Sequence, residues 1–288
     1  MRLIDHYFQP AAHRTLYHYS SISGLMGIVD HRAVWAGHAY YLNDTREIIH
    51  AVDVLTTLLR KFRNLLGLEE PFSEQLIAWL KTFRETPYHI FIFSLSEEES
   101  LLSQWRSYTP HGKGVSIGFR KETIDHILQT PGFRLAQCLY TEEEHKQLLG
   151  SLMEKLNETF RQQSHPALSA RHSVLKLDPF FESYRGEFLQ VMAIVKHEAF
   201  REEREWRILS PYYASYVGEQ VQFRAGASMI MPYTVLDLPR EGLLFDEVIL
   251  GPSRDVNLSH HALSTYLSNK KVCNATISSL IPYRQWEK

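Results

Sequence analysis

The sequence predicts an α+β protein in which mixed or antiparallel central sheets carry helical insertions. Short apolar strands occur in groups and do not alternate regularly with helices, which argues against a doubly wound sheet. Two long segments, near residues 45–85 and 141–198, have the apolar periodicity of helices. The chain has 288 residues, a length that suits one large domain, so we expect one α+β domain that spans residues 1–288.

The predicted strands are short runs of β-branched, aromatic and aliphatic residues bounded by turn-forming residues. The clearest is the apolar run at 88–96, which has the pattern of a buried strand. An early strand at 14–19 places Tyr17 and Tyr19 on one face and His18 on the other. Further strands are expected at residues 33–36, 115–119, 133–140, 205–209, 216–223, 247–252 and 271–278.

The predicted helices separate these groups of strands. Asp44 and Glu47 have the spacing of a capping box at the start of a long helix that continues to about residue 66. Other helices are expected over residues 22–29, 72–85, around Trp105, and at 141–163, 179–198 and 257–269.

Composition limits the classes of partner and compartment. The 31 basic and 33 acidic residues leave a net charge of −2, so no uniform attraction to nucleic acid or to an anionic membrane is expected. The longest apolar runs hold about five residues, far below the roughly 20 that span a bilayer. Two isolated cysteines, Cys138 and Cys273, suit a reducing compartment. The N-terminus has no signal-peptide pattern, so we expect a cytoplasmic protein.

The common catalytic motifs are absent, and the acidic tract at 198–205 is the main candidate for metal binding. The sequence contains no GxxxxGK[ST], GxGxxG, HExxH or GxSxG pattern. Glu198, Glu202, Glu203 and Glu205 could supply oxygen ligands to a cation. Adjacent acidic residues on one segment point in different directions, however, so we expect no metal site.

The segment Glu203-Arg204-Glu205-Trp206-Arg207 carries a more specific pattern. On a strand, Glu203, Glu205 and Arg207 share one face and Trp206 lies on the other. We expect Trp206 to be buried and the charged face to look into solvent or a cleft, so that Glu205 does not contribute to packing. Two interpretations remain open: a solvated face or internal ion pair, and a catalytic carboxylate held by a neighbouring cation.

Two further candidates lie on predicted strands, and each has a simpler explanation. His18 lies between two tyrosines and could be an ordinary core or edge residue. Ser94 lies near the end of the apolar strand, where a hydroxyl often bonds only to nearby backbone.

Five blocks of sequence together resemble a bacterial domain-of-unknown-function family, number 2971. The blocks are LYHYSS at 16–21, YYLNDTRE at 40–47, FSLSEEESLLSQWRSYTPHGKGVSIGF at 93–119, FREEREWRI at 200–208 and DEVILGP at 246–252. They extend over residues 16–252, and only their combination is specific. Because no activity is settled for this family, the resemblance implies no reaction.

The order of four polar residues also resembles ADP-ribosyltransferases of the His-Tyr-Glu type. The resemblance implies an ADP-ribosyltransferase-like fold and NAD as the substrate, with Glu205 as the catalytic residue and His18, Tyr41 and Ser94 in NAD binding. It departs from a minimal transferase core in its large helical segments. Other candidate site residues are Tyr19, Asn43, Asp44, Trp105, Glu203 and Arg207.

We therefore expect an NAD-consuming ADP-ribosyltransferase or NAD glycohydrolase, acting as a toxin or effector in bacterial conflict or defence, with His18 and Glu205 facing one cleft. The ADP-ribose acceptor, whether protein, nucleic acid or water, stays open, as does association with a partner protein or a second copy. Two alternatives remain: a metal-dependent nuclease or phosphohydrolase using the Glu198–Glu205 cluster, and a non-enzymatic ligand-sensing or partner-binding module.

Overall fold

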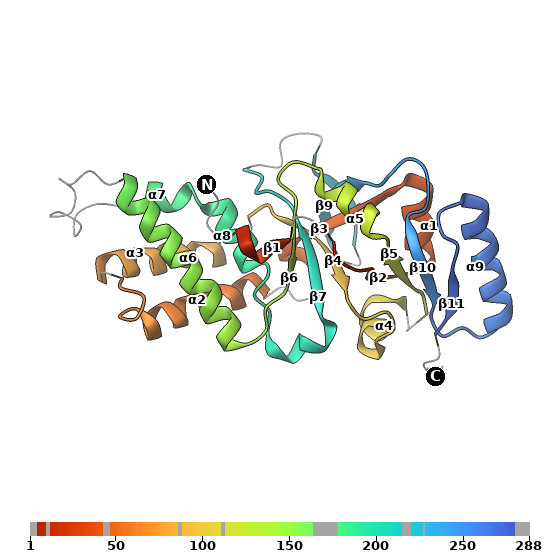
Figure 1. Ribbon diagram of the computed structural model, residues 1–288, viewed down its shortest axis with the longest axis horizontal. Coiled ribbons are helices and arrows are strands. Elements are labelled where there is room, and N and C mark those ends of the chain that lie inside the picture. Colours follow the sequence, from red (N-terminus) through yellow and green to blue (C-terminus); the bar gives the residue numbers. More distant parts are fainter. Residues whose placement is uncertain are drawn as a thin grey trace.

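A mixed, mainly antiparallel sheet runs along the molecule between a helical lobe and a C-terminal helix (Figure 1). The computed structural model describes residues 5–9, 12–42, 47–68, 70–85, 88–110, 113–163, 178–214, 220–226 and 228–279. Within them the main strand order is β1-β6-β7-β4-β2-β5-β10-β11, and β3, β9 and β8 branch from β4. The predicted α+β class with helical insertions is confirmed.

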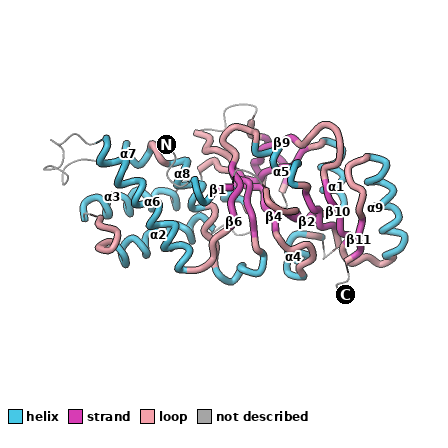
Figure 2. Tube along the Cα trace, viewed as in Figure 1, coloured by secondary structure: helices cyan, strands magenta, loops and turns pink. Residues whose placement is uncertain are grey.

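The strands are short, and most lie where their sequence patterns predict. In chain order they are β1 (Phe8–Gln9), β2 (Leu16–Ser20), β3 (Ala33–His38), β4 (Phe91–Ser96), β5 (Val115–Phe119), β6 (Arg134–Gln137), β7 (Glu205–Leu209), β8 (Gln222–Ala225), β9 (Ile230–Asp237), β10 (Phe245–Leu250) and β11 (Thr276–Ser278). Figure 2 shows the strands, in magenta, in the middle of the molecule, with helices, in cyan, at both ends.

Five helices form what we call the helical lobe, at the left of Figure 1. They are α2 (Glu47–Phe62), α3 (Glu70–Lys81), α6 (Glu142–Gln163), α7 (Asp178–Glu182) and α8 (Arg185–Met192). The remaining helices are α1 (Ile22–His31), α4 (Leu102–Tyr108), α5 (Lys121–Leu128) and α9 (Val256–Lys270). Short 3-10 helices occur at η1 (Asp5–Tyr7), η2 (Ala39–Tyr41), η3 (Thr82–Arg84) and η6 (Glu198–Glu203).

The sheet divides at β4, and this fork positions the site described below. The C-terminal end of β4 pairs with β2, where Ser96 lies opposite Tyr17. Its N-terminal end pairs with β3, where Ile92 lies opposite Gly37. The intervening residues of β4 pair with β7 on the other side, and Ser94 lies opposite Arg207. A space therefore opens between the β2 branch and the β3 branch.

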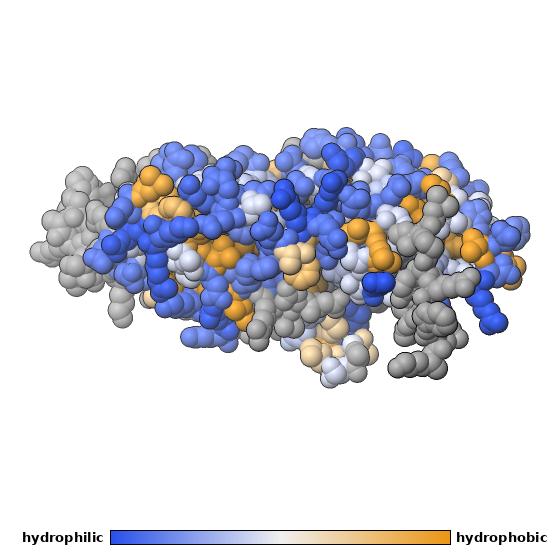
Figure 3. All heavy atoms as spheres, turned by 90° about the horizontal axis from the view of Figure 1, so that it is seen from below, coloured by the Kyte–Doolittle hydropathy of each residue, from blue (hydrophilic) through white to orange (hydrophobic). Residues whose placement is uncertain are grey.

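Two separate hydrophobic clusters support the fork. One joins the inner faces of the helical lobe to the adjoining ends of β4, β6 and β7. The other packs α1, α5 and α9 against β2, β5 and β10. Seen from below, the surface is mostly hydrophilic and its hydrophobic residues form small separate groups (Figure 3). No helix in the described part of the chain is long and apolar enough to cross a bilayer.

Several elements differ from the prediction, including β1 and α5, where no strand or helix was expected. The helix expected over 179–198 is divided into α7 and α8, and a 3-10 helix follows from Glu198. The strand predicted at 216–223 is shifted to β8, with residues 215–219 outside the described part. Strand β9 was not anticipated. It contains Pro232, which lies beyond the last residue that pairs with β3, so the missing N–H does not interrupt that ladder.

Trp206 is not the fully buried residue that the sequence predicted. It is only partly buried, and its indole Nε1 donates a hydrogen bond to Glu97 Oε1 at 2.9 Å. Trp105, by contrast, is completely buried and packs edge-on against Tyr19, with 5.1 Å between the ring centroids. Trp105 is therefore the stronger packing anchor of the two.

We expect Trp105→Ala to lower the free energy of unfolding by about 3–5 kcal/mol, because it removes a fully buried aromatic side chain. Trp206→Ala should cost less than about 3 kcal/mol, since part of its ring already contacts water. Urea denaturation of both variants measures the difference. A Trp206→Ala variant less stable than Trp105→Ala would contradict this assignment of the core.

Candidate functional site

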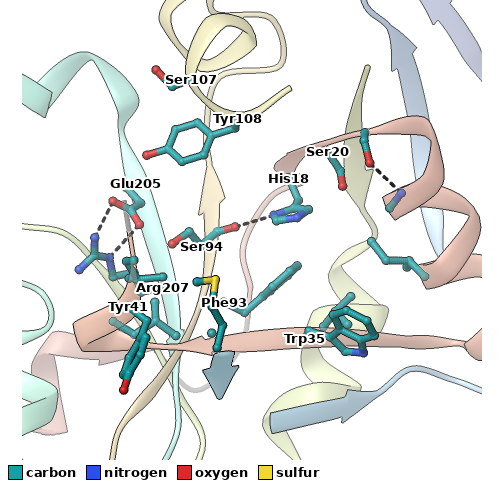
Figure 4. Close-up of a pocket in the computed structure, with 18 of the residues that line it drawn as sticks. His18, Ser20, Trp35, Tyr41, Phe93, Ser94, Ser107, Tyr108, Glu205 and Arg207 are labelled. Carbon is teal, nitrogen blue, oxygen red and sulfur yellow. Dashed lines mark hydrogen bonds and ion pairs between the residues drawn. The ribbon is translucent and has the colours of Figure 1, made fainter. Parts of the chain in front are cut away.

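A cavity of about 930 Å³ occupies the fork of the sheet, and we call it the fork cavity. Its volume lies at the upper end of the range for small-molecule sites. The walls come from β2, β3, β4, β7, β8, β9, α1, α4 and the segments before α2 and β7 (Figure 4). Polar groups and rings alternate around it: His18, Ser20, Trp35, Tyr41, Phe93, Ser94, Ser107, Tyr108, Glu205 and Arg207.

Six of the predicted site residues line this cavity. They are His18, Tyr41, Ser94, Glu203, Glu205 and Arg207. They come from four separated segments of the chain, so the fold brings together what the sequence left apart.

Two other predicted site residues lie outside the wall of the fork cavity. Tyr19 and Trp105 belong to a small hydrophobic cluster that includes Ile249, and neither lines the fork cavity. Their aromatic character serves packing, which corrects the expectation that they form part of the site. Asn43 and Asp44 lie outside the described residues.

Glu205 and Arg207 form a buried, two-point ion pair at one end of the cavity. Arg207 Nε donates to Glu205 Oε1 at 2.8 Å, and Arg207 Nη2 donates to Glu205 Oε2 at 3.0 Å. Both residues lie on the same face of β7, as the strand periodicity predicts. The charged face is buried, with only 5% of Glu205 and 1% of Arg207 exposed, so of the interpretations left open the internal ion pair is present and the solvated face is not.

Lys196 completes what we call the ion cluster: Glu47, Lys196, Glu203, Glu205 and Arg207. Its Nζ lies 2.5 Å from Glu203 Oε2 and 2.5 Å from Glu205 Oε2. It also lies 3.8 Å from Glu47 Oε1, and Arg207 Nη2 lies 2.6 Å from Glu47 Oε2. The cluster therefore ties the start of α2 to the segment before η6 and to β7.

Sequence reasoning missed Lys196 and Glu47. Lys196 directly follows the apolar run 191–195, and a single charge at the end of a buried segment was the available signal. Glu47 was considered only as a helix cap. Glu203 was expected on the strand with Glu205, but it ends η6, and Arg204 between them adopts a left-handed conformation with φ of 41°. This bend lets both carboxyl groups reach Lys196.

Backbone and phenol groups add hydrogen bonds to the cluster. Arg207 Nη1 donates to the carbonyl of Ala193 at 2.6 Å, and the backbone N–H of Glu205 donates to the hydroxyl of Tyr140 at 2.8 Å. Charges removed from water are tolerated only when they are paired and hydrogen-bonded in this way.

The two glutamates that share Lys196 have opposite pKa shifts. Burial opposes ionisation of Glu205, but Arg207 and Lys196 outweigh it and hold the pKa of Glu205 well below its usual value. Burial raises the pKa of Glu203 despite the attraction of Lys196, and the nearby Glu205 and Glu47 add to the rise. Carboxyl groups with divergent pKa values suit different chemical roles, one as a fixed charge and one as a proton carrier.

The ammonium group of Lys196 occupies the position between Glu203 and Glu205 where a cation would need to bind. Among the described residues, no group of three or more His, Cys, Asp or Glu side chains has an arrangement that could hold a metal ion. The carboxylates of the cluster are thus paired with cationic side chains of the protein itself.

His18 lies in the middle of the cavity as a neutral hydrogen-bond acceptor. Its Nδ1 lies 3.0 Å from the carbonyl oxygen of Ser94, and a carbonyl can only accept, so Nδ1 carries the proton. Burial lowers the pKa of His18, although the bond to Ser94 opposes the shift. Nε2 has no hydrogen-bond partner in the described part of the chain, and the ring packs 4.6 Å from Phe93. A ligand can therefore donate a hydrogen bond to Nε2.

The comparisons with known proteins identify a family without assigning an activity. The family model described as "Protein of unknown function (DUF2971)" matches residues 104–208, which include Lys196, Glu203, Glu205 and Arg207. This confirms the predicted family resemblance over a narrower range than 16–252. No curated protein and no solved structure matches the chain.

The geometry overturns the expectation that Glu205 is dispensable for packing. We expect Glu205→Gln to lower the free energy of unfolding by about 3–5 kcal/mol, because it leaves Arg207 and Lys196 buried with one fewer negative partner. Glu203→Gln should lower it by less, because burial opposes ionisation of Glu203, whereas Arg207 and Lys196 favour ionisation of Glu205. Chemical denaturation at pH 7 compares the two variants. Each differs from the wild type by the replacement of one carboxylate oxygen with an amide nitrogen.

Measuring the stability of both the wild type and Glu205→Gln as the pH is lowered tests whether the charge of Glu205 causes the difference. The folded-state pKa of Glu205 lies below its unfolded value, so its stabilising contribution is present above the unfolded value and is lost as pH falls through the folded one. The stability difference between the wild type and Glu205→Gln should therefore shrink below about pH 4. A difference that stays constant from pH 7 to pH 3 would show that charge is not its cause.

Proposed function

We propose that this protein is an NAD-consuming enzyme of the ADP-ribosyltransferase or NAD glycohydrolase type, with the fork cavity as its active site. The observation that supports this most is the convergence of His18, Tyr41, Ser94 and Glu205 on one cavity. The order of these residues in the sequence, which is independent of the fold, matches the His-Tyr-Glu pattern. The forked sheet is also the basis for proposing an ADP-ribosyltransferase-like fold.

The proposed reaction breaks the bond between nicotinamide and ribose. The bonding electron pair leaves with nicotinamide, which becomes neutral, and positive charge develops at the anomeric carbon. Glu205 is ionised and lines the cavity, so it can stabilise that charge without reorganisation. A water or acceptor hydroxyl then bonds to the carbon and releases its proton.

Glu203 is suited to accept that proton. Its raised pKa makes it a better base than Glu205, and Lys196 holds it beside the reacting end of the cavity. With Nδ1 bonded to the Ser94 carbonyl, His18 can accept a hydrogen bond through Nε2, so it can hold an N–H of the carboxamide or a ribose hydroxyl. The rings of Tyr41 and Tyr108 line the same end and can pack on nicotinamide (Figure 4).

The ion cluster gives less support to a metal-dependent nuclease or phosphohydrolase, because the Lys196 ammonium already occupies the position between Glu203 and Glu205. A binding module without turnover would need no proton carrier such as Glu203.

We extend the proposal to a cytoplasmic toxin or defence effector, since consumption of NAD would harm the cell in which it occurs. The acceptor, and any partner protein or second copy, are left open in this proposal.

The test is nicotinamide release from NAD, measured with water, protein and nucleic acid as acceptors. We expect turnover by the wild type and a loss of about 10²–10³-fold in Glu205→Gln, because a neutral amide cannot stabilise the developing charge. Circular dichroism sets a temperature at which both proteins are folded.

Glu202→Gln is the matched control, since Glu202 is an exposed carboxylate on η6 that does not line the cavity. It should release nicotinamide at the wild-type rate. Absence of nicotinamide release by the folded wild type with every acceptor would refute the proposal. Equal rates for Glu205→Gln and the wild type would remove Glu205 from catalysis.

A further inference from the structure

The end of the fork cavity opposite the ion cluster has its own aromatic and cationic wall. The strand register places Trp35 opposite Val235, Gly37 opposite Tyr233, and Arg224 opposite Met231. Paired residues of antiparallel strands share a face. One face of the β3–β9–β8 ribbon therefore presents Trp35, Gly37, Met231 and Arg224 to the cavity.

Trp35 offers a large open ring at this end. Its ring centroid lies 4.4 Å from that of Tyr233 with 33° between the planes, so Tyr233 supports the indole. Half of the Trp35 residue surface, 50%, is exposed. Figure 4 shows Trp35 on the far side of His18 from Glu205. A supported indole with an open surface is suited to stacking with a planar ring of a ligand.

Helix α1 leaves space in the same part of the cavity wall. Gly27 lines the cavity, and a Cβ built on it would have no atom within 4 Å. A glycine inside a helix costs about 0.5–1 kcal/mol relative to alanine. Nothing in the fold requires Gly27, because its φ is not positive and its side-chain position is empty. The vacancy instead enlarges the cavity.

Arg224 supplies a cation that no described carboxylate neutralises. The other two cations of the cavity wall, Lys196 and Arg207, are paired with glutamates. Arg224 is exposed on β8 and forms no ion pair with any carboxylate in the described part of the chain. A guanidinium group in such a position favours a phosphate.

From these observations we propose that the Trp35 end of the fork cavity binds a phosphorylated nucleoside, with its base on Trp35 beside Gly27 and its phosphate at Arg224. The inference rests on the proposed function in one respect: the adenylate half of NAD would occupy this end while nicotinamide lies at the ion cluster. Trp35, Gly27 and Arg224 would select the nucleotide, and no residue of the ion cluster takes part in this subsite.

The experiment is calorimetric titration with AMP and with adenosine, neither of which contains nicotinamide. Wild-type protein should bind AMP more tightly than adenosine, and Arg224→Gln should remove most of that difference. Trp35→Ala should weaken AMP binding by about 5- to 150-fold, the range typical of one base stacked on an aromatic side chain. Trp35→Phe retains a ring and should recover most of the affinity.

Gly27→Leu places a side chain in the empty space and should abolish AMP binding without unfolding the protein. Its matched control is Gly150→Leu, because Gly150 also lies within a helix, in α6, with no atom within 4 Å of a built Cβ, and does not line the cavity. Gly150→Leu should bind AMP as the wild type does.

The outcomes separate this inference from the proposed function. Failure of the wild type to bind AMP, or unchanged AMP affinity in both Trp35→Ala and Gly27→Leu, would overturn the nucleotide subsite even if NAD is consumed. AMP binding that depends on Trp35 supports the subsite even if no nicotinamide is released, in which case only the proposed reaction fails.

Discussion

The buried ion pair between Glu205 and Arg207 is the interaction on which the rest of the site depends. Through Arg207 it reaches the end of α8 and the start of α2, and through Lys196 it fixes the end of η6. The helical lobe and the forked sheet therefore meet at charged groups rather than at hydrophobic residues alone. Burial of these charges is costly unless every partner is present, which explains why three glutamates and two cations occur together.

The fork gives this cluster a cavity in which to act. Because β4 pairs with β2 near Ser96 and with β3 near Ile92, the middle of β4 is left to face the cavity. His18 bonds the Ser94 carbonyl at this point and turns its Nε2 acceptor toward any ligand. The cavity thus carries the ion cluster at one end and Trp35 with Arg224 at the other, and we relate these two ends to the two halves of NAD.

Much of the fold could be predicted from the sequence, because the strands β2, β4, β5 and β10 and the long helices have strong local periodicity. Strand β9 could not, since Pro232 argues against a strand and only the pairing with β3 and β8 establishes one. The shared face of Glu205 and Arg207 followed from strand alternation. Its burial did not, because periodicity cannot tell which face a helical lobe covers. Lys196 and Glu47 reach the site only through long-range packing.

The central claim is that the two ends of the fork cavity hold one dinucleotide. A crystal structure of the Glu205→Gln variant grown with NAD tests it most directly, since slower turnover would preserve the intact molecule. We predict density that extends from Tyr41 and residue 205, past His18, to Trp35. An unoccupied cavity at saturating NAD, or NAD bound elsewhere on the surface, would contradict the account.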